Sequence, residues 1–199
     1  GGVSGLFQLA SQGDMIMTQK PKKFEYLIAI IALIRPGVGD FNEYVARRNG
    51  KKFEIHPDRE WYMKDTVGLM TYQEQFLLDC KTFAGWDIAF ADNNIRKNKR
   101  IKDDTDIRDK FINDSVSRGY DRDFIEKIWQ EIEDAVSGGY SFNKSHSTSY
   151  GVLSYKTAWL KCHYPVYWYA SLLNSAIKDS TLDWSPISEF RSDAYQYTG

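Results

Sequence analysis

The longest apolar stretch of the sequence is YLIAIIALI, residues 26–34, which carries no charged side chain. Its nine residues are too few to cross a bilayer as a helix, which takes about 20. The stretch stops at Arg35-Pro36-Gly37, where the proline cannot continue a helix and the glycine lets the chain turn. It therefore predicts a helix buried in a protein core, and other segments have to supply the side chains that cover it.

Signals for helix starts and stops recur along the chain. Asp40 and Glu43 fit the start of a helix that ends before Gly50, and Thr71 and Glu74 fit a capping box that opens a helix ending at Gly85. Apolar periodicity and proline positions predict further helices over residues 121–136 and 146–161, from Pro165, and, as a short one, from Ser185. Only residues 51–57 and 66–70 are plausible strands. The predicted fold is mostly α, with at most two short strands.

Composition limits the classes of function. With 199 residues, 42% hydrophobic and 27% charged, the chain is long enough for one globular domain or one domain and a small appendage. Its net charge of −1 means that any affinity for nucleic acid has to come from a local patch. The two cysteines and three histidines match no metal-ligand spacing, and the cysteines favour a reducing compartment with two buried thiols. The Asp-x-Asp pairs 104/106 and 121/123 could hold Mg²⁺, but the second opens a predicted helix and fits a cap.

A basic cluster, NNIRKNKRIK, occupies residues 93–102. On a helix, Arg96, Lys99 and Arg100 would share a face with Lys97 beside it, and such a group suits phosphate oxygens. The other interpretation is a solvated helix face, because DDTD at residues 103–106 follows at once. Spacing alone favours the solvated face.

The segment SFNKSHSTSY, residues 141–150, is dense in hydrogen-bonding groups. One hypothesis is a nucleotide site, in which Lys144 meets phosphate at a helix N-terminus and Tyr150, one turn from His146, offers a stacking surface for a base. The alternative is a helix start capped by Asn143 or Ser145, with His146 on the surface. Spacing does not decide between them.

Four stretches together resemble one family. Residues 5–14 (GLFQLASQGD), 24–37, 71–77 (TYQEQFL) and 140–165 (YSFNKSHSTSYGVLSYKTAWLKCHYP) are similar, in order and separation, to the C-family replicative DNA polymerases, the bacterial DNA polymerase III α subunits. The resemblance covers nearly the whole chain and weakens after about residue 178. It implies a largely helical fingers domain over residues 1–178 and the start of a connector region over residues 179–199.

The resemblance also implies roles for individual residues. Arg96 and Lys97, which follow Ala91-Asp92, fall where the family places a basic pair that grips the triphosphate. Lys144, His146 and Tyr150 fall in the motif beside the nucleotide pocket. The remaining basic residues of the patch, with the Arg-Pro-Gly turn, are expected to bind DNA: Lys99, Arg100 and Arg35. The chain departs from the family pattern at Ala10, at Val38 and in NKRIKDD after the basic pair.

The family's catalytic carboxylates lie in a palm domain, in a stretch of the Pro-Asp-Phe-Asp type that this sequence does not contain. Mg²⁺ would therefore be held by a palm outside this chain, and no nucleotidyl transfer is expected from the chain alone. The start at Gly1, without methionine, fits a piece of a longer polypeptide. Implied partners are a DNA primer–template, a deoxynucleoside triphosphate and the palm and thumb of the same polymerase. The resemblance leaves open whether a sliding clamp and other replisome subunits are also partners. No membrane is expected, and the implied compartment is the cytoplasm of a bacterium, with a phage-encoded origin also open.

A second hypothesis belongs to another class of protein. The chain could be a non-catalytic helical interaction module that binds DNA or polymerase subunits. Its docking surface would be the aromatic-rich tail, YPVYWYASLL at residues 164–173 and DAYQY at residues 193–197.

Overall fold

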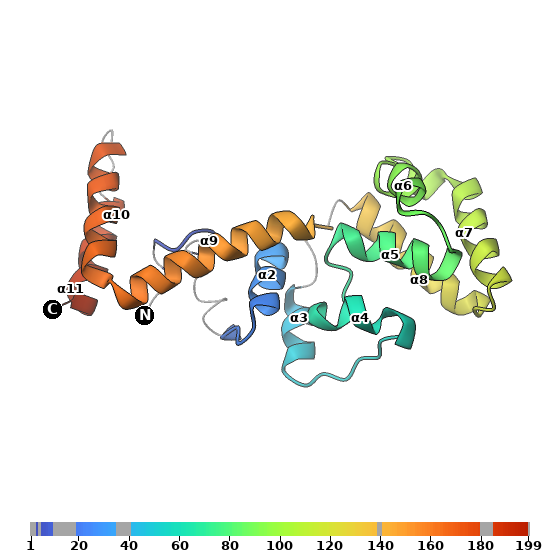
Figure 1. Cartoon of the computed structure of the whole chain (residues 1–199), viewed down its shortest axis with the longest axis horizontal. Coiled ribbons are helices and arrows are strands. Elements are labelled where there is room, and N and C mark those ends of the chain that lie inside the picture. The colour runs from blue at the N-terminus through green and yellow to red at the C-terminus, as the bar shows by residue number, and fades with distance from the viewer. Residues whose placement is uncertain are drawn as a thin grey trace. The chain divides into compact units, whose positions relative to one another are not determined.

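The computed structural model describes residues 3, 5–9, 19–34, 41–138, 141–179 and 185–198, and these are predominantly helical (Figure 1). The mostly-α prediction is therefore confirmed. The α-helices, in chain order, are α2 (Phe24–Leu33), α3 (Phe41–Arg48), α4 (Glu60–Met63), α5 (Gln73–Ala84), α6 (Ile88–Ala91), α7 (Thr105–Ser117), α8 (Arg122–Ser137), α9 (Lys144–His163), α10 (Pro165–Asp179) and α11 (Ser185–Thr198). The short turns are η2 (Pro57–Arg59), η3 (Lys64–Thr66), η4 (Asp92–Arg96) and η5 (Ile101–Asp103). Within the described ranges, no helix has the length and apolar character needed to span a membrane.

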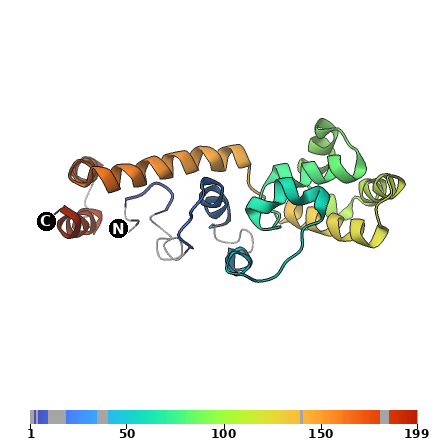
Figure 2. The ribbon, with the colours of Figure 1, turned by 60° about the horizontal axis from the view of Figure 1, so that its bottom comes forward.

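The chain divides into two compact units, residues 28–147 and residues 1–27 with 148–199. Helices α2 and α9 each contribute to both units, and α9 runs unbroken over 20 residues (Figure 2). The predicted boundary between residues 178 and 179 stays a prediction.

The core of the unit formed by residues 28–147 lies where α5, α7 and α8 pack against one another. Each helix contributes side chains that are almost fully buried, such as Phe83, Phe111 and Ile132. Burying one such side chain stabilises the fold by about 1.5–3 kcal/mol. The predicted amphipathic helix over residues 121–136 is confirmed as α8, whose N-cap Asp121 accepts a hydrogen bond from the Phe124 N–H at 2.9 Å.

The predicted core helix is confirmed as α2. Its residues 28–33 are at most 4% exposed, as expected of a continuous apolar run. The first turn of α9 packs there, because the buried Ser147 hydroxyl donates a hydrogen bond of 2.6 Å to the Ile28 carbonyl. The Arg35-Pro36-Gly37 turn that should end α2 lies outside the described residues.

Both predicted strands are wrong for the part of the chain that the structure describes. Residues 51–56 run without secondary structure, and residues 66–70 form the end of η3 and a turn in which Val67 and Gly68 have φ of +49° and +78°. A strand needs a neighbour for its backbone groups, and the helices leave none beside these segments. The described residues contain one isolated parallel bridge instead, between Tyr72 and Phe142, with N–H to carbonyl distances of 2.9 Å on either side.

The ends of α5 confirm one signal and correct another. Gly85 has φ of +72° just past the helix, which is the left-handed conformation predicted for the stop. At the start, Gln75 and not Glu74 reaches back, because its side-chain oxygen accepts from the N–H groups of Thr71 and Tyr72 at 2.7 Å each. The capping box was therefore placed one residue early: Tyr72 is the N-cap, so the third helical residue is Gln75.

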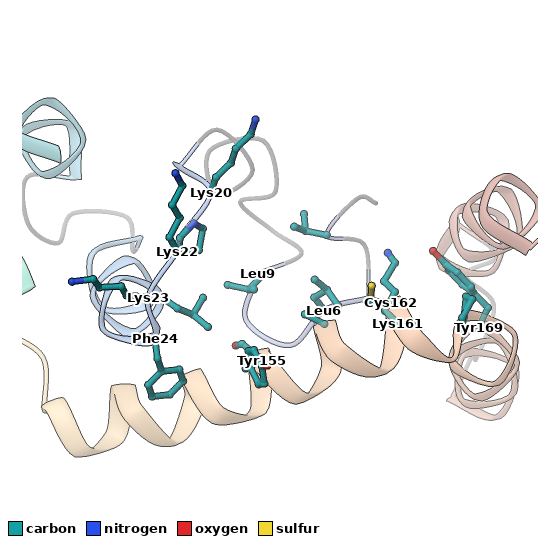
Figure 3. A pocket seen from close by; sticks show the side chains of 16 residues that line it. Leu6, Leu9, Lys20, Lys22, Lys23, Phe24, Tyr155, Lys161, Cys162 and Tyr169 are labelled. Atoms are coloured by element: carbon teal, nitrogen blue, oxygen red, sulfur yellow. The ribbon is translucent and has the colours of Figure 1, made fainter. Parts of the chain in front are cut away.

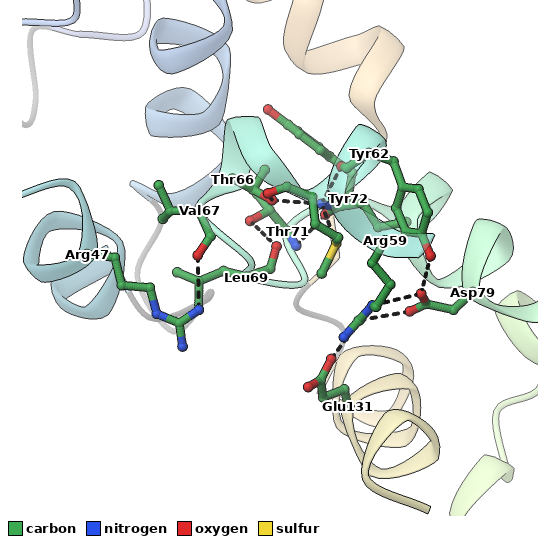
Figure 4. Close-up of polar contacts among 12 residues, drawn as sticks. Arg47, Arg59, Tyr62, Thr66, Val67, Leu69, Thr71, Tyr72, Asp79 and Glu131 are labelled. Atoms are coloured by element: carbon green, nitrogen blue, oxygen red, sulfur yellow. Dashed lines mark hydrogen bonds and ion pairs between the residues drawn. The ribbon is translucent and has the colours of Figure 1, made fainter. Parts of the chain in front are cut away.

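A buried ionic network joins four elements of this unit (Figure 4). The Arg59 guanidinium, in η2, donates to both Asp79 oxygens at 3.0 Å and to the Glu131 carboxylate of α8 at 2.7 Å. The Tyr62 hydroxyl donates to the same Asp79 carboxylate at 2.7 Å. Asp79 is fully buried, and this burial raises the pKa of its carboxyl to about 6 against the opposing hydrogen bonds from Arg59 and Tyr62.

Removing one charge of this network should destabilise the unit strongly. We expect Asp79→Leu to lower the free energy of unfolding by about 3–5 kcal/mol, because it leaves the Arg59 guanidinium buried with only the half-exposed Glu131 as its counter-ion. The double variant Arg59→Met/Asp79→Leu removes both buried charges and should recover most of that loss. Urea unfolding of the full chain measures both values. The Tyr62 hydroxyl loses its acceptor in both variants, so its contribution cancels. Equal stabilities would contradict the account.

Candidate nucleotide and nucleic-acid interface

The predicted triphosphate-binding pair, Arg96 and Lys97, lies at the end of η4, a π-helical turn that continues α6. Both side chains approach the Asp92 carboxylate: Arg96 through two nitrogens, one of them at 3.1 Å, and Lys97 through Nζ at 2.9 Å. These hydrogen bonds, from Arg96 first and then Lys97, hold the pKa of Asp92 well below its usual range. The structure therefore brings the two cations together on one exposed turn with a shared counter-ion.

The helical face predicted for Arg96, Lys99 and Arg100 does not form. The π-turn ends at Arg96, and residues 97–100 form turns. The Asn98 side chain pins this bend, because it donates to Asp104 at 2.7 Å and accepts from the Arg100 N–H at 3.0 Å. The following Ile101 is buried, which also directs the chain into the core. Lys99 and Arg100 are exposed, and the Arg100 side chain lies 3.9 Å from the Asp103 carboxylate.

The first turn of α9 shows how SFNKSH folds. The Asn143 side-chain oxygen accepts from the His146 N–H at 2.9 Å and from the Ser145 hydroxyl at 2.5 Å, so Asn143 caps the helix. The Lys144 N–H donates to the Glu74 carboxylate of α5 at 3.0 and 3.1 Å. A carboxylate therefore already occupies the positive end of α9, where sequence reasoning expected an anion.

The side chains of Lys144 and His146 lie beside aromatic rings at this helix start. The Lys144 ammonium is 5.6 Å from the centroid of the Tyr72 ring, a cation–π contact. The His146 ring lies 5.3 Å from the Phe142 ring. Lys144 is half-buried and His146 is exposed, so both can be reached from solvent.

Tyr150 belongs to the other compact unit, together with the N-terminal loop. Its ring stacks on the Phe7 ring at 5.2 Å and 8°, so that one face is covered. The loop is fixed to α9 by hydrogen bonds from the Ser154 hydroxyl to the Phe7 carbonyl at 2.8 Å and from the Phe7 N–H to the Thr157 hydroxyl at 3.4 Å. A base could stack only on the other face of the Tyr150 ring.

Of the two thiols predicted to be buried, Cys80 is buried and Cys162 is exposed. Arg35 lies outside the described residues, as do Ala10 and Val38. The Asp-x-Asp pairs serve as helix caps: Asp104 accepts from the Ile107 N–H at 3.2 Å, and Asp121 caps α8. Among the described residues no group of three or more histidine, cysteine or acidic side chains could hold a metal ion.

Sequence reasoning missed three residues that organise these sites: Asp92, Glu74 and Phe7. Only Asp92 carried a usable signal, because it precedes Arg96 by four residues, the spacing of a helical ion pair. The Glu74 contact spans 70 residues of chain, and the stacked Phe7 and Tyr150 are farther apart still. Such pairs are not visible in local spacing.

Taken together, these features define a helical domain with cations on an exposed turn and at a helix start. Residues 1–119 match the model of the bacterial DNA polymerase III alpha subunit finger domain. That match includes Arg96 and Lys97 but not Lys144, His146 and Tyr150.

Curated relatives agree with that match. The chain is 37% identical over 189 residues to the DNA polymerase III subunit alpha of Aquifex aeolicus, covering 90% of this chain and 16% of that protein. It is 34% identical over 192 residues to the subunit of the same name from Pseudomonas aeruginosa, with 89% and 16% covered. It is 33% identical over 181 residues to the Error-prone DNA polymerase 1 of Agrobacterium fabrum, with 86% and 16% covered.

The chain belongs to the finger-domain family of bacterial DNA polymerase III alpha subunits, which confirms the resemblance seen in the sequence. It spans 16% of the length of these relatives.

The cap at the start of α9 can be tested directly. We expect Asn143→Ala to lower the free energy of unfolding by about 1 kcal/mol, because the His146 N–H loses its acceptor. Asn143→Asp keeps an acceptor at the same place and should cost much less. Denaturant unfolding of the two variants makes the comparison, and equal losses would show that the side-chain oxygen does not cap the helix.

Proposed function

We propose that this chain is the fingers portion of a DNA-directed DNA polymerase and that it binds the incoming deoxynucleoside triphosphate and the template during replication. Family membership supports the polymerase assignment. The observation that carries the binding role is the pairing of Arg96 and Lys97 on one exposed turn. Two adjacent cations, one with a planar fork of donors, suit the oxygens of a triphosphate.

The Asp92 carboxylate orients the Arg96 and Lys97 side chains before the nucleotide binds. It keeps both side chains on one side of η4 while the site is empty of phosphate. A triphosphate carries several negative charges and can replace one carboxylate as the partner of both cations. The side chains are then already ordered when the anion binds, which lowers the entropic cost of binding.

Lys144 and His146 would contribute from the start of α9. Because Glu74 and Asn143 already accept from the N–H groups of Lys144 and His146, phosphate contact there depends on the two side chains rather than on those amides. Tyr150 would line the base pocket with the ring face opposite Phe7. Lys99, Arg100 and Arg35 would contact the DNA backbone.

Mg²⁺ would be held by the palm in this proposal, because the family's catalytic carboxylates lie in the palm. Bound there, the ion would stabilise the charge that develops during phosphoryl transfer. The fingers residues position the nucleotide and neutralise its charge, so the chain alone should not polymerise. Its proposed partners are primer–template, the palm and thumb of the same polymerase and, through them, a clamp and replisome subunits, in the cytoplasm of a bacterium or of a phage-infected cell.

The exposed aromatic residues of the C-terminal helices favour a second candidate, a non-catalytic interaction module. Tyr167 on α10 and Tyr195 on α11 are 77% and 82% exposed. Tyr169, between them in sequence, is 2% exposed and belongs to the interior. The tail is therefore only partly a surface that could dock on another protein.

Fluorescence anisotropy of a labelled primer–template, titrated with the full chain across a salt series, tests the proposed phosphate contact. The logarithm of the association constant should fall linearly with the logarithm of salt concentration. In Arg96→Glu/Lys97→Glu the slope should be shallower by about 2, since two phosphate contacts are lost.

A matched control reverses two lysines on other surfaces, Lys81→Glu/Lys127→Glu. It changes the net charge equally and should leave the slope nearly unchanged. The same slope in both double variants would contradict a phosphate contact at Arg96 and Lys97. Absence of binding by the unaltered chain at low salt would favour the interaction-module candidate.

A further inference from the structure

A cavity of about 850 Å³ lies within the unit formed by residues 1–27 and 148–199 (Figure 3). None of the residues proposed above to bind nucleotide or DNA lines it. Three segments line it: the N-terminal loop, the residues that lead into α2, and α9 with the start of α10. Its floor is apolar and well buried, with Leu6, Leu9 and Tyr169 at 8%, 4% and 2% exposure. The volume is that of a site for a small ligand or a few nucleotides.

The charges in the cavity wall have one sign. The lining contains Lys20, Lys22, Lys23 and Lys161 and no acidic residue, although the whole chain has a net charge of −1. Lys161 is 8% exposed and lies 3.6 Å from the Asp193 carboxylate, so its charge is largely compensated.

The three lysines ahead of α2 are exposed, and none forms an ion pair with a described carboxylate. Figure 3 shows the Lys20 and Lys22 side chains extending away from α9, and the Lys23 side chain extending to the other side of the segment that leads into α2. The Lys23 ammonium lies 5.6 Å from the centroid of the Tyr26 ring. The cavity therefore presents uncompensated positive charge at one end.

Two aromatic rings stand at the cavity without aromatic partners. Phe24, at the start of α2, is 37% exposed, and Tyr155, on α9, is 57% exposed. Neither ring stacks on another ring among the described residues, in contrast to Tyr150. Exposed aromatic faces beside lysines that can follow a phosphate chain are the combination found in grooves for single-stranded nucleic acid.

We propose that this cavity binds a few nucleotides of single-stranded DNA, with bases against Phe24 and Tyr155 and phosphates against Lys20, Lys22 and Lys23. The apolar floor accommodates base and sugar, and the lysines supply the sequence-independent attraction. The inference rests on the proposed DNA-binding function and extends it: the unpaired template strand, rather than the duplex or the triphosphate, is the ligand of this site.

The probe is a labelled oligothymidylate of about 12 nucleotides, a length within the range of single-strand grooves. A labelled abasic oligomer with the same number of phosphates serves as the comparison, because it lacks only the bases. Anisotropy with the full chain should show tighter binding of the oligothymidylate, by roughly tenfold. Lys20→Gln/Lys22→Gln/Lys23→Gln should make the salt slope shallower by about 2, as expected for three phosphate contacts on a single strand. Tyr155→Ala should reduce the preference for the base-bearing oligomer and leave the slope unchanged.

Matched controls are Lys81→Gln/Lys127→Gln/Lys178→Gln for charge and Tyr195→Ala for an exposed aromatic ring, with circular dichroism of every variant to verify folding. Equal binding of the two oligomers by the unaltered chain would overturn the proposal, since the cavity would then attract phosphate alone. Equal slopes in the two lysine variants would overturn it as well, and so would displacement of the oligothymidylate by polyglutamate at equal charge concentration.

The variant Arg96→Glu/Lys97→Glu separates the two proposals. It should weaken binding of a blunt-ended DNA duplex, which has no unpaired template strand, and spare the oligothymidylate, whereas the lysine variant of the cavity should do the reverse. If Arg96→Glu/Lys97→Glu left duplex binding unchanged while the lysine variant still weakened binding of the oligothymidylate, the result would contradict the phosphate contact at Arg96 and Lys97. The proposal for the cavity would be unaffected.

Discussion

The unit that carries the basic turn depends on a carboxylate buried away from water. The cost of burying the Asp79 carboxylate is offset by hydrogen bonds that Arg59 and Tyr62 donate to it from two other elements. The Arg59 guanidinium also donates to Glu131, which lies on a third element. Such a network adds little net stability compared with apolar packing, but removing one member is costly. Its effect is to fix how η2, α4, α5 and α8 meet. The end of α5 leads directly through Gly85 into α6 and η4, so the position of Arg96 and Lys97 follows from that of α5.

The two predicted sites differ in how their charges are balanced. At η4, an acidic residue holds two cations on one exposed turn, and the proposed function has an incoming triphosphate replace that residue as their partner. At the start of α9, Asn143 and Glu74 satisfy backbone N–H groups, so the turn is complete as a helix cap. The Lys144 and His146 side chains lie beside the Tyr72 and Phe142 rings. The cap is confirmed, and the nucleotide role of Lys144 and His146 stays a proposal that the cap does not oppose.

Local chemistry made much of the fold predictable. The apolar run of α2, the cap at Asp121 and the stop at Gly85 depend on neighbours within a few residues, and all three were confirmed. α7 was missed, although Asp104 and the buried Ile107, Phe111 and Ile112 carry a readable cap and periodicity. The strand predictions failed because a strand forms only beside a second paired segment, and the local sequence does not show whether one is present. The pair Arg59–Asp79, the Glu74 contact and the cavity beside Tyr155 arise from segments far apart in sequence, and no local spacing reveals them.

We propose that Arg96, Lys97 and Lys144 hold the phosphates of an incoming nucleotide. Pre-steady-state nucleotide incorporation, measured with the complete polymerase polypeptide carrying Arg96→Ala or Lys144→Ala, tests it most directly, with Lys127→Ala as a surface control. The apparent Kd for the deoxynucleoside triphosphate should rise about tenfold or more in each variant, the loss expected for a charged hydrogen bond to phosphate, and should stay close to the unaltered value in the Lys127→Ala control. An unchanged nucleotide Kd in both variants would contradict the claim.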